Sequence, residues 1–210
     1  MQVVTGKHAK LGASLACNRI PTVPYETSQV PALHWLEQQS PLADSADPLT
    51  RDWLFDQGSL TRRLTRLSAD QFSVTPLYEG WQQLRVDECA RLGLAPGSEG
   101  WVREVYLRGH GQPWVYARSV AARSALQQGG LDMEALGSRS LGELLFCSPG
   151  FARQAIEVCH YPAAWLPAEQ RHDGLWARRS RFDQGELSIL VAEIFLPALW
   201  QATDTRLEDR

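Results

Sequence analysis

The chain has 210 residues, of which 44% are hydrophobic, so it holds enough apolar material for one ordinary domain but is short for two. Its 24 acidic and 21 basic residues give a formal net charge of −3, which excludes the polycationic surface typical of nucleic-acid or acidic-membrane binding. The sequence contains no apolar run long enough to span a membrane. We therefore expect a small-molecule partner.

The N-terminal part differs in composition from the rest. Residues 1–30 contain prolines and glycines without periodicity, so we expect a poorly ordered arm there and a single domain over residues 31–210. The four cysteines are widely spaced and form no CxxC pair, which predicts neither a zinc site nor a disulfide framework. Free thiols are typical of a reducing cytoplasm.

The first predicted elements are two short helices joined by a tight turn. Residues 49–57 carry apolar side chains at helical spacing, and Gly58 is expected to end that helix. Ser59 can cap a second helix over residues 60–67, in which leucines recur at helical spacing.

The pattern then changes to β. Residues 72–81 are typical of a strand broken at Pro76, and a loop rich in glycine and proline follows. The clearest hairpin comes next, with strands at 101–107 and 114–120 around a turn at 108–111.

The C-terminal half repeats this organisation. Residues 131–136 and 140–146 predict a second pair of short helices, 155–160 predicts a strand, and 176–182 with 187–196 predicts a closing hairpin. Hairpin-joined strands with separate helices indicate an α+β fold, a single antiparallel sheet with helices packed on it. The two helix pairs could act as lids over one face, although packing alone explains them equally well.

Arg103 is the first candidate for a site residue. Strand alternation places it with apolar Trp101 and Val105 on one face of the sheet. A guanidinium keeps its charge and binds carboxylates through two parallel hydrogen bonds, so Arg103 needs an anion there. A salt bridge to a core glutamate would supply that anion as well as a ligand would, and it is the commoner arrangement.

Glu193 is the second candidate, because it lies inside the apolar strand 187–196. An unpaired buried carboxylate costs several kcal/mol, so the fold must give it a partner, either a ligand or a cation. The basic run Arg178, Arg179 and Arg181 lies across the hairpin and could pair with Glu193 or hold an anion. Such a run more often forms a solvated strand face.

Two helix starts could add backbone donors. The residues from Ser140 to Glu143 match a capping box, which makes Leu141 the first helical residue, with a free amide at the positive end of the helix dipole. Leu60 follows Ser59 in the same way. Most helix starts bind only water, so these two matter only if they meet Arg103 in space.

Other kinds of site find little support in the sequence. Adjacent Cys159 and His160 would point to opposite faces of a strand, which excludes a thiol–imidazole dyad. The P-loop, GxGxxG and HExxH motifs are absent. We therefore predict no metal and no cofactor.

Five segments, in this order, resemble the chorismate pyruvate-lyases that make 4-hydroxybenzoate for ubiquinone synthesis: DWLFDQGSLTRRL, GWVREVYLRGHGQPWVYARSV, SLGELLF, LWARRSRF and AEIFLPA. The resemblance runs from about Asp52 to Pro197. It implies a cofactor-independent lyase that converts chorismate to 4-hydroxybenzoate and pyruvate in the cytoplasm. It also implies helical flaps that enclose the ligand, and slow product release, hence product inhibition.

The resemblance further implies roles for four residues. Arg103 would bind the ring carboxylate together with the Leu141 amide, and Glu193 would hydrogen-bond the 4-hydroxyl. Leu60 stands where relatives often carry Met, so a backbone or packing role would survive that change and a role for sulfur would not. Whether Glu193 removes the ring proton or only orients the hydroxyl stays open.

Arg178 or Arg179 is the candidate for the second carboxylate of chorismate, on the enolpyruvyl group. The alternative function is a non-catalytic effector-binding domain, because related sheets serve as ligand sensors in bacterial regulators. Such sensors usually follow a winged-helix domain, and residues 1–48 are too short and too poor in basic residues to form one. We expect a monomer that binds chorismate and 4-hydroxybenzoate, with no nucleic acid and no membrane span.

Overall fold

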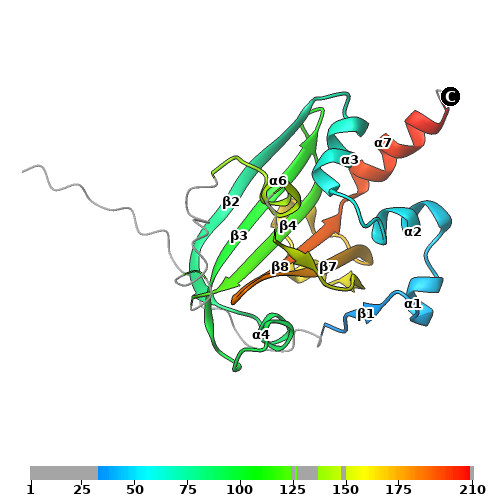
Figure 1. Ribbon diagram of the computed structural model, residues 1–210. Coiled ribbons are helices and arrows are strands. Elements are labelled where there is room, and N and C mark those ends of the chain that lie inside the picture. The colour runs from blue at the N-terminus through cyan, green and yellow to red at the C-terminus, as the bar shows by residue number, and fades with distance from the viewer. Residues whose placement is uncertain (1–32, 124–125, 127–136, 148–149, 209–210) are drawn as a thin grey trace, which may run out of the picture. The chain divides into compact units, whose positions relative to one another are not determined.

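The computed structural model describes residues 33–123, 126, 137–147 and 150–208. The strands within these residues are β1 (Leu36–Glu37), β2 (Phe72–Gln83), β3 (Glu99–Gly109), β4 (Gln112–Ala122), β5 (Ala152–Arg153), β6 (Glu157–Tyr161), β7 (Leu175–Gln184) and β8 (Leu187–Phe195). They form one antiparallel sheet in the order β1-β6-β7-β8-β4-β3-β2, and β5 pairs with β7 beside that path (Figure 1). The predicted α+β class is confirmed.

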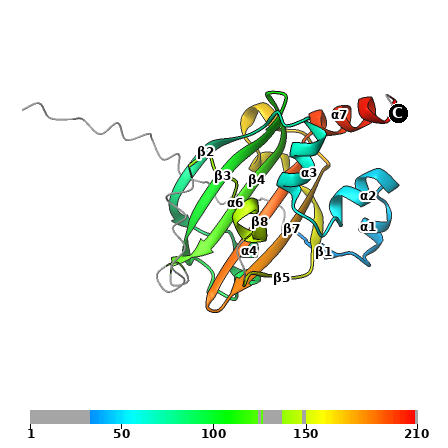
Figure 2. The ribbon, with the colours of Figure 1, turned by 45° about the horizontal axis from the view of Figure 1, so that its top comes forward.

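The described helices are α1 (Pro41–Asp44), α2 (Pro48–Leu54), α3 (Leu60–Leu67), α4 (Val86–Leu92), α6 (Leu141–Cys147) and α7 (Pro197–Glu208), with short 3₁₀ turns at η2 (Ala163–Trp165) and η3 (Ala168–Gln170). None of these helices is long and apolar enough to cross a membrane. Figures 1 and 2 show α3 and α6 over the same face of the sheet.

Two apolar clusters hold helices on that face. Leu54 of α2 and Leu60 and Leu64 of α3 pack near one end of the strands, against residues such as Val105 and Phe195. Near the other end, Leu141 and Leu145 of α6 pack against a second set that includes Trp101, Ala121, Phe182 and Ile189. We call this side of the sheet the site face.

The opposite face has its own core. Leu84, Cys89 and Leu92, from α4 and the residues before it, pack on Val102 and Val120 of the sheet. This helix was not predicted, because its residues fall in a segment with flanking glycines and a proline that resembles a loop. Its apolar spacing and the left-handed Gly93 at its C-cap (φ 72°) are signals that could have revealed it.

The first predicted helix pair is present, but its first helix ends earlier than expected. Asp47 caps α2 by accepting hydrogen bonds from the amides of Leu49 and Thr50, and the helix stops at Leu54 rather than at Gly58. The reason is that Asp56 accepts a hydrogen bond from the Gly58 amide (2.7 Å), a local turn that competes with the helix.

Pro76 does not break the strand that contains it. Strand β2 continues to Gln83 and only shifts its register between Pro76 and Tyr78. Because β2 is the edge strand of the described sheet, it is a place where a proline can be accommodated.

Both predicted hairpins are confirmed: β3, β4 and β7 are longer than expected, whereas β8 ends one residue earlier. The first turns in two residues, His110 and Gly111, whose φ angles of 50° and 77° are the left-handed values that a tight hairpin requires. The helix predicted over 131–136 lies outside the described residues, whereas its predicted partner is α6. The C-terminal helix α7 was not predicted.

Candidate active site

A band of polar side chains crosses the site face between the two apolar clusters. In the strand register, Arg103 lies opposite Ser119, Ser180 lies opposite Val191, and Arg178 lies opposite Glu193. We define the polar band as these polar residues: Arg103, Ser119, Arg178, Ser180 and Glu193. All except Glu193 are at most 5% exposed, which is unusual for such residue types and requires specific partners.

Arg103 forms one end of the band. Its Nε donates to Glu79 on β2 (2.7 Å), and its Nη2 donates to the carbonyl oxygens of Gly137 (2.6 Å) and Arg139 (2.9 Å). Arg103 therefore has the glutamate partner that sequence reasoning offered as the structural alternative to a ligand. Its Nη1 donates to no residue of the described part of the chain, so one side of the guanidinium keeps hydrogen-bonding capacity.

The contact with Arg139 brings Arg103 close to the start of α6. Leu141 is the first residue of this helix, and Ser140 caps it by accepting a hydrogen bond from the Glu143 amide (3.3 Å). Among described residues the Leu141 amide has no acceptor, as expected for a first helical residue. Arg103 and the start of the helix at Leu141, which the sequence could only place separately, are therefore neighbours.

The start of α3 lies against the start of α6. Thr61 Oγ1 and Ser140 Oγ share a hydrogen bond of 2.7 Å. A Cβ atom at Gly142 would lie 3.1 Å from Thr61 Oγ1, so the glycine permits this close approach. Leu60, the first residue of α3, is 4% exposed and belongs to the apolar cluster beside the band.

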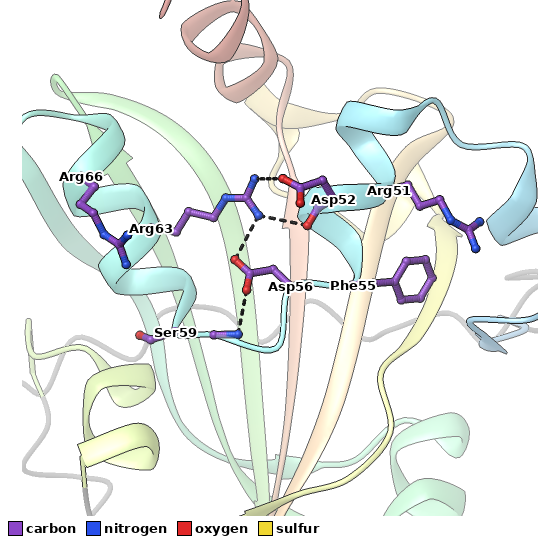
Figure 3. A pocket seen from close by; sticks show the side chains of 8 residues that line it. Arg51, Asp52, Phe55, Asp56, Ser59, Arg63 and Arg66 are labelled. Atoms are coloured by element: carbon purple, nitrogen blue, oxygen red, sulfur yellow. Dashed lines mark hydrogen bonds and ion pairs between the residues drawn. The ribbon is translucent and has the colours of Figure 1, made fainter.

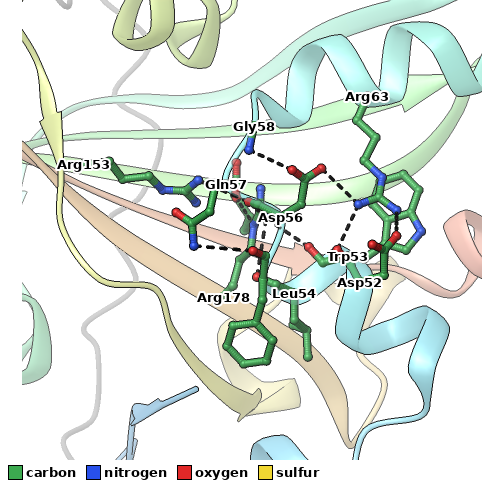
Figure 4. Close-up of polar contacts among 11 residues, drawn as sticks. Asp52, Trp53, Leu54, Asp56, Gln57, Gly58, Arg63, Arg153 and Arg178 are labelled. Atoms are coloured by element: carbon green, nitrogen blue, oxygen red, sulfur yellow. Dashed lines mark hydrogen bonds and ion pairs between the residues drawn. The ribbon is translucent and has the colours of Figure 1, made fainter. Parts of the chain in front are cut away.

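Glu193 and Arg178 form the other end of the band. Arg178 Nε donates to Glu193 Oε2 (2.6 Å). Its Nη1 donates to the carbonyl oxygens of Trp53 (3.0 Å) and Asp56 (3.0 Å) (Figure 4). Arg178 is 1% exposed and the Glu193 side chain 16%. The carboxylate that the sequence placed in an apolar strand is thus paired with a buried cation, which in turn holds the end of α2.

The loop between α2 and α3 is also held by Arg63 of α3. Arg63 pairs with Asp52 (2.5 Å) and Asp56 (3.0 Å) (Figure 3). Its guanidinium also lies 3.6 Å from the centre of the Trp53 ring. Burial raises the pKa of Asp56, but hydrogen bonds from the Gly58 amide and Arg63 outweigh it and lower that pKa below its usual value. Asp52, Asp56, Gly58 and Arg63 are among the residues that line a surface pocket of about 500 Å³, and this lining includes neither Arg103 nor Glu193.

Arg179 does not belong to the band. Alternation along β7 sends it to the opposite face, where its Nε donates to Glu157 (2.7 Å) and its Nη1 to Asp87 (3.0 Å). It therefore cannot hold a ligand group beside Arg178. The expectation of a solvated strand face is also wrong, because Arg178 and Arg179 are both buried.

Cys159 and His160 behave as expected from alternation. Cys159 is buried on the opposite face, whereas His160 is exposed beside Trp176. Burial raises the pKa of the Cys159 thiol, which disfavours the thiolate that a nucleophile needs. The structure gives no support to a cysteine-based site here.

Sequence reasoning missed Arg153, which reaches the polar band from the short strand β5. Its Nε donates to Ser180 Oγ (2.9 Å) and its Nη1 to the Asp56 carbonyl oxygen (3.3 Å). A strand of two residues offers no alternation pattern from which the direction of the side chain could be inferred.

Sequence reasoning also missed an ionic cluster on the opposite face. Arg118 is 4% exposed and donates to Glu88 on α4 (2.6 and 3.1 Å) and to Glu104 (2.7 Å). Burial alone would lower the pKa of Arg118 and raise that of Glu88, but their mutual attraction moves both in the direction that keeps them charged. Since every group has an opposite charge beside it, this cluster is explained by folding alone.

Comparisons with known proteins agree with the resemblance found in the sequence. Residues 32–205 match the family model described as chorismate lyase. The chain is 68% identical over 180 residues to a protein of Pseudomonas entomophila (strain L48) named "Probable chorismate pyruvate-lyase 2", covering 86% of this chain and 97% of that protein. It is 69% identical over 178 residues to "Probable chorismate pyruvate-lyase" of Pseudomonas putida (strain KT2440), covering 85% and 96%.

Among solved structures, the PhnF C-terminal domain is similar with a TM-score of 0.49 and 12% sequence identity, covering 59% of this chain and 82% of that domain.

Proposed function

Because the chain belongs to the chorismate lyase family, we propose that it converts chorismate to 4-hydroxybenzoate and pyruvate at the polar band. The observation that supports this location most is that Arg103, the start of α6 and Glu193 lie on one face of the sheet, under the same helices. The product is expected to supply ubiquinone synthesis, as the sequence resemblance implies.

The spacing of the band suits an aromatic acid with polar groups at opposite ends. Arg103 on β3 and Glu193 on β8 are separated by β4, so their backbones lie about 10 Å apart across the sheet. Both side chains extend from the same face of the sheet. We assign the ring carboxylate to Arg103 Nη1 and the Leu141 amide, and the ring hydroxyl to Glu193, with Leu60 as apolar cover.

The reaction needs no external oxidant or reductant. The bond between the ring carbon and the enolpyruvyl oxygen breaks, and its electron pair leaves with enolpyruvate. The ring carbon that bears the hydroxyl loses its hydrogen as a proton, which leaves an aromatic ring. Enolpyruvate gains a proton on its methylene carbon and becomes pyruvate, so atoms and charge balance.

The residues of the band contribute by positioning and by charge. Holding both ends of the dianion in a reactive geometry can lower a barrier by up to about 7–11 kcal/mol. Arg178 keeps Glu193 in place through the 2.6 Å ion pair, so that Glu193 can accept a hydrogen bond from the ring hydroxyl. Because 4-hydroxybenzoate keeps both end groups, it should bind at the same contacts as the substrate.

We propose that the helices over the site face act as lids. Arg103 and Ser119 are only 2% and 5% exposed beneath them, so a ligand can enter and leave only when α3 or α6 moves. Slow opening of this cover would delay the release of 4-hydroxybenzoate and produce the expected product inhibition.

An assay with purified protein and chorismate, in buffer with a metal chelator, tests the activity. We expect 4-hydroxybenzoate and pyruvate to appear in equal amounts. Glu193→Gln should lower turnover about 100-fold or more, the range reported for loss of a group acting on the reacting atoms. Glu186→Gln, in the exposed turn of the same hairpin, serves as the matched control and should retain wild-type rates.

Binding of chorismate without formation of either product would contradict the enzyme and favour an effector-binding domain. Wild-type turnover in Glu193→Gln would leave the activity in place and remove the site assignment.

A further inference from the structure

Arg153 differs from the two arginines of the polar band in the charge around it. Arg103 is paired with Glu79 and Arg178 with Glu193. Within the described part of the chain, no carboxylate forms an ion pair with Arg153. Its two hydrogen bonds go to neutral acceptors, Ser180 Oγ and the Asp56 carbonyl oxygen.

The surroundings of Arg153 disfavour an uncompensated charge. The side chain is partly buried, and its guanidinium carbon lies 5.7 Å and 5.6 Å from the ring centres of Phe146 and Phe182, which attract a cation weakly but supply no counter-charge. Burial first, and then repulsion from Arg178, lower the pKa of Arg153 to about 10, although Glu193 and Asp56 act in the other direction. A guanidinium stays charged even there, so the site would be stabilised by an added anion.

The position of this cation relative to Glu193 follows from a shared acceptor. Arg153 Nη1 (3.3 Å) and Arg178 Nη1 (3.0 Å) both donate to the carbonyl oxygen of Asp56, so the two guanidinium groups are neighbours (Figure 4). Arg178 also binds Glu193. Arg153 therefore lies at the Glu193 end of the polar band, far from the Arg103 end.

The substrate carries a group that fits this place. Chorismate has one carboxylate on the ring and a second one on the enolpyruvyl group, which is attached next to the ring carbon that bears the hydroxyl. If Glu193 faces the hydroxyl, the enolpyruvyl carboxylate comes near the same end of the band. Arg178 is already neutralised by Glu193, and Arg179 lies on the opposite face.

We propose that Arg153 binds the enolpyruvyl carboxylate of chorismate and holds this group as the bond to the ring breaks. The proposal rests on the proposed function above and replaces the sequence-based candidates Arg178 and Arg179. Hydrogen bonds to Ser180 and to the Asp56 carbonyl fix the guanidinium in position for this contact.

The proposal separates the substrate from the product, because 4-hydroxybenzoate lacks the second carboxylate. We expect Arg153→Gln to lower kcat/KM for chorismate about 30-fold or more, the usual effect of removing one member of a buried charge pair. The dissociation constant of 4-hydroxybenzoate should change by about twofold at most, as for a substitution away from the ligand. Arg153→Lys keeps the charge but loses the paired donors of the guanidinium, so its kcat/KM for chorismate should lie between those of wild type and Arg153→Gln.

Two further variants serve as controls. Arg103→Gln should weaken the binding of both chorismate and 4-hydroxybenzoate, because both carry the ring carboxylate. Arg123→Gln removes an exposed arginine and should change neither.

If Arg153→Gln weakens the binding of 4-hydroxybenzoate as much as it lowers kcat/KM for chorismate, Arg153 only holds the loop between α2 and α3. If it changes neither quantity, Arg153 has no role in the site. Either result overturns the proposal. Failure of the wild-type protein to turn over chorismate is a different result, which contradicts the activity itself. In that case the dissociation constant of chorismate replaces kcat/KM in the same comparison.

Discussion

Arg178 connects Glu193 to the loop between α2 and α3 through one buried guanidinium. The burial of Arg178 could not be predicted from the sequence, because a run of arginines on a strand is more often solvated. Its connection to the loop could not be predicted either, because the carbonyl oxygens that Arg178 binds come from residues more than a hundred positions away. Alternation along the strand did contain the information that Arg178 and Arg179 face opposite sides.

Replacing Arg178 should destabilise the fold. In Arg178→Met, Glu193 loses its cation and the carbonyl oxygens of Trp53 and Asp56 lose a donor. Breaking a buried ion pair on one side costs about 3–5 kcal/mol, so the free energy of unfolding measured by urea denaturation should fall by that amount. The exposed pair of Arg123 and Glu99 offers the comparison, since Arg123→Gln should cost about 1 kcal/mol or less. Equal stability of Arg178→Met and wild type would show that the pair contributes little.

Among single residues, Arg103 and Glu193 could be singled out because a charged group in an apolar pattern is visible in the sequence. Their structural partners, Glu79 and Arg178, could not be identified, because pairing depends on which strands become neighbours. Arg153 lies in too short a strand to show any pattern.

The turn between α2 and α3 is stabilised by an ionised side chain. The pKa of Asp56 is lowered in the folded protein by the Gly58 amide and Arg63, despite burial. A carboxyl group with a depressed folded pKa contributes stability above its unfolded pKa of about 3.9, and this contribution is lost as the pH falls through the folded pKa. The loop should therefore weaken at acidic pH.

Asp56→Asn tests this pH dependence. At neutral pH the variant should have a lower free energy of unfolding than wild type, and at acidic pH the difference should shrink, because wild-type Asp56 loses its charge as the pH falls through its lowered folded-state pKa. Urea denaturation at both pH values measures the difference. Asp173→Asn, at an exposed loop position, should have the same free energy of unfolding as wild type at both pH values. A constant difference between Asp56→Asn and wild type would assign the effect to shape rather than charge.

Helix α4 is attached to the opposite face by charge as well as by apolar contacts. Glu88 is 6% exposed and receives two hydrogen bonds from Arg118 and one from the Arg85 amide. Glu88→Gln should lower the free energy of unfolding by about 3–5 kcal/mol, because it leaves Arg118 with less compensation. Turnover measured well below the melting temperature should stay at the wild-type level, since this face carries no site residue. Loss of turnover in a folded variant would contradict that separation of roles.

At the element level, strands and hairpins could be predicted because alternation and turn residues are local signals. The early end of α2 and the continuity of β2 past Pro76 could not, because both depend on neighbours: a side-chain turn at Asp56 in one case, and an edge position in the other. Helix α4 was missed because its flanking glycines and proline suggested a loop.

Over the described part of the molecule, one sheet separates two kinds of buried charge. The opposite face pairs each of its buried arginines with carboxylates, which is what a structural cluster requires. On the site face, Arg103 Nη1 keeps a free hydrogen-bond donor at one end of the polar band, and Arg153 has no paired carboxylate at the other end. This asymmetry suits a dianion bound on one face only.

If the polar band holds both ends of the aromatic acid, a crystal structure of the protein with 4-hydroxybenzoate will show the contacts at each end. We predict the carboxylate within hydrogen-bond distance of Arg103 and the Leu141 amide, and the hydroxyl within hydrogen-bond distance of Glu193. A ligand bound elsewhere, for example in the pocket lined by Arg51 and Arg63, would contradict the account.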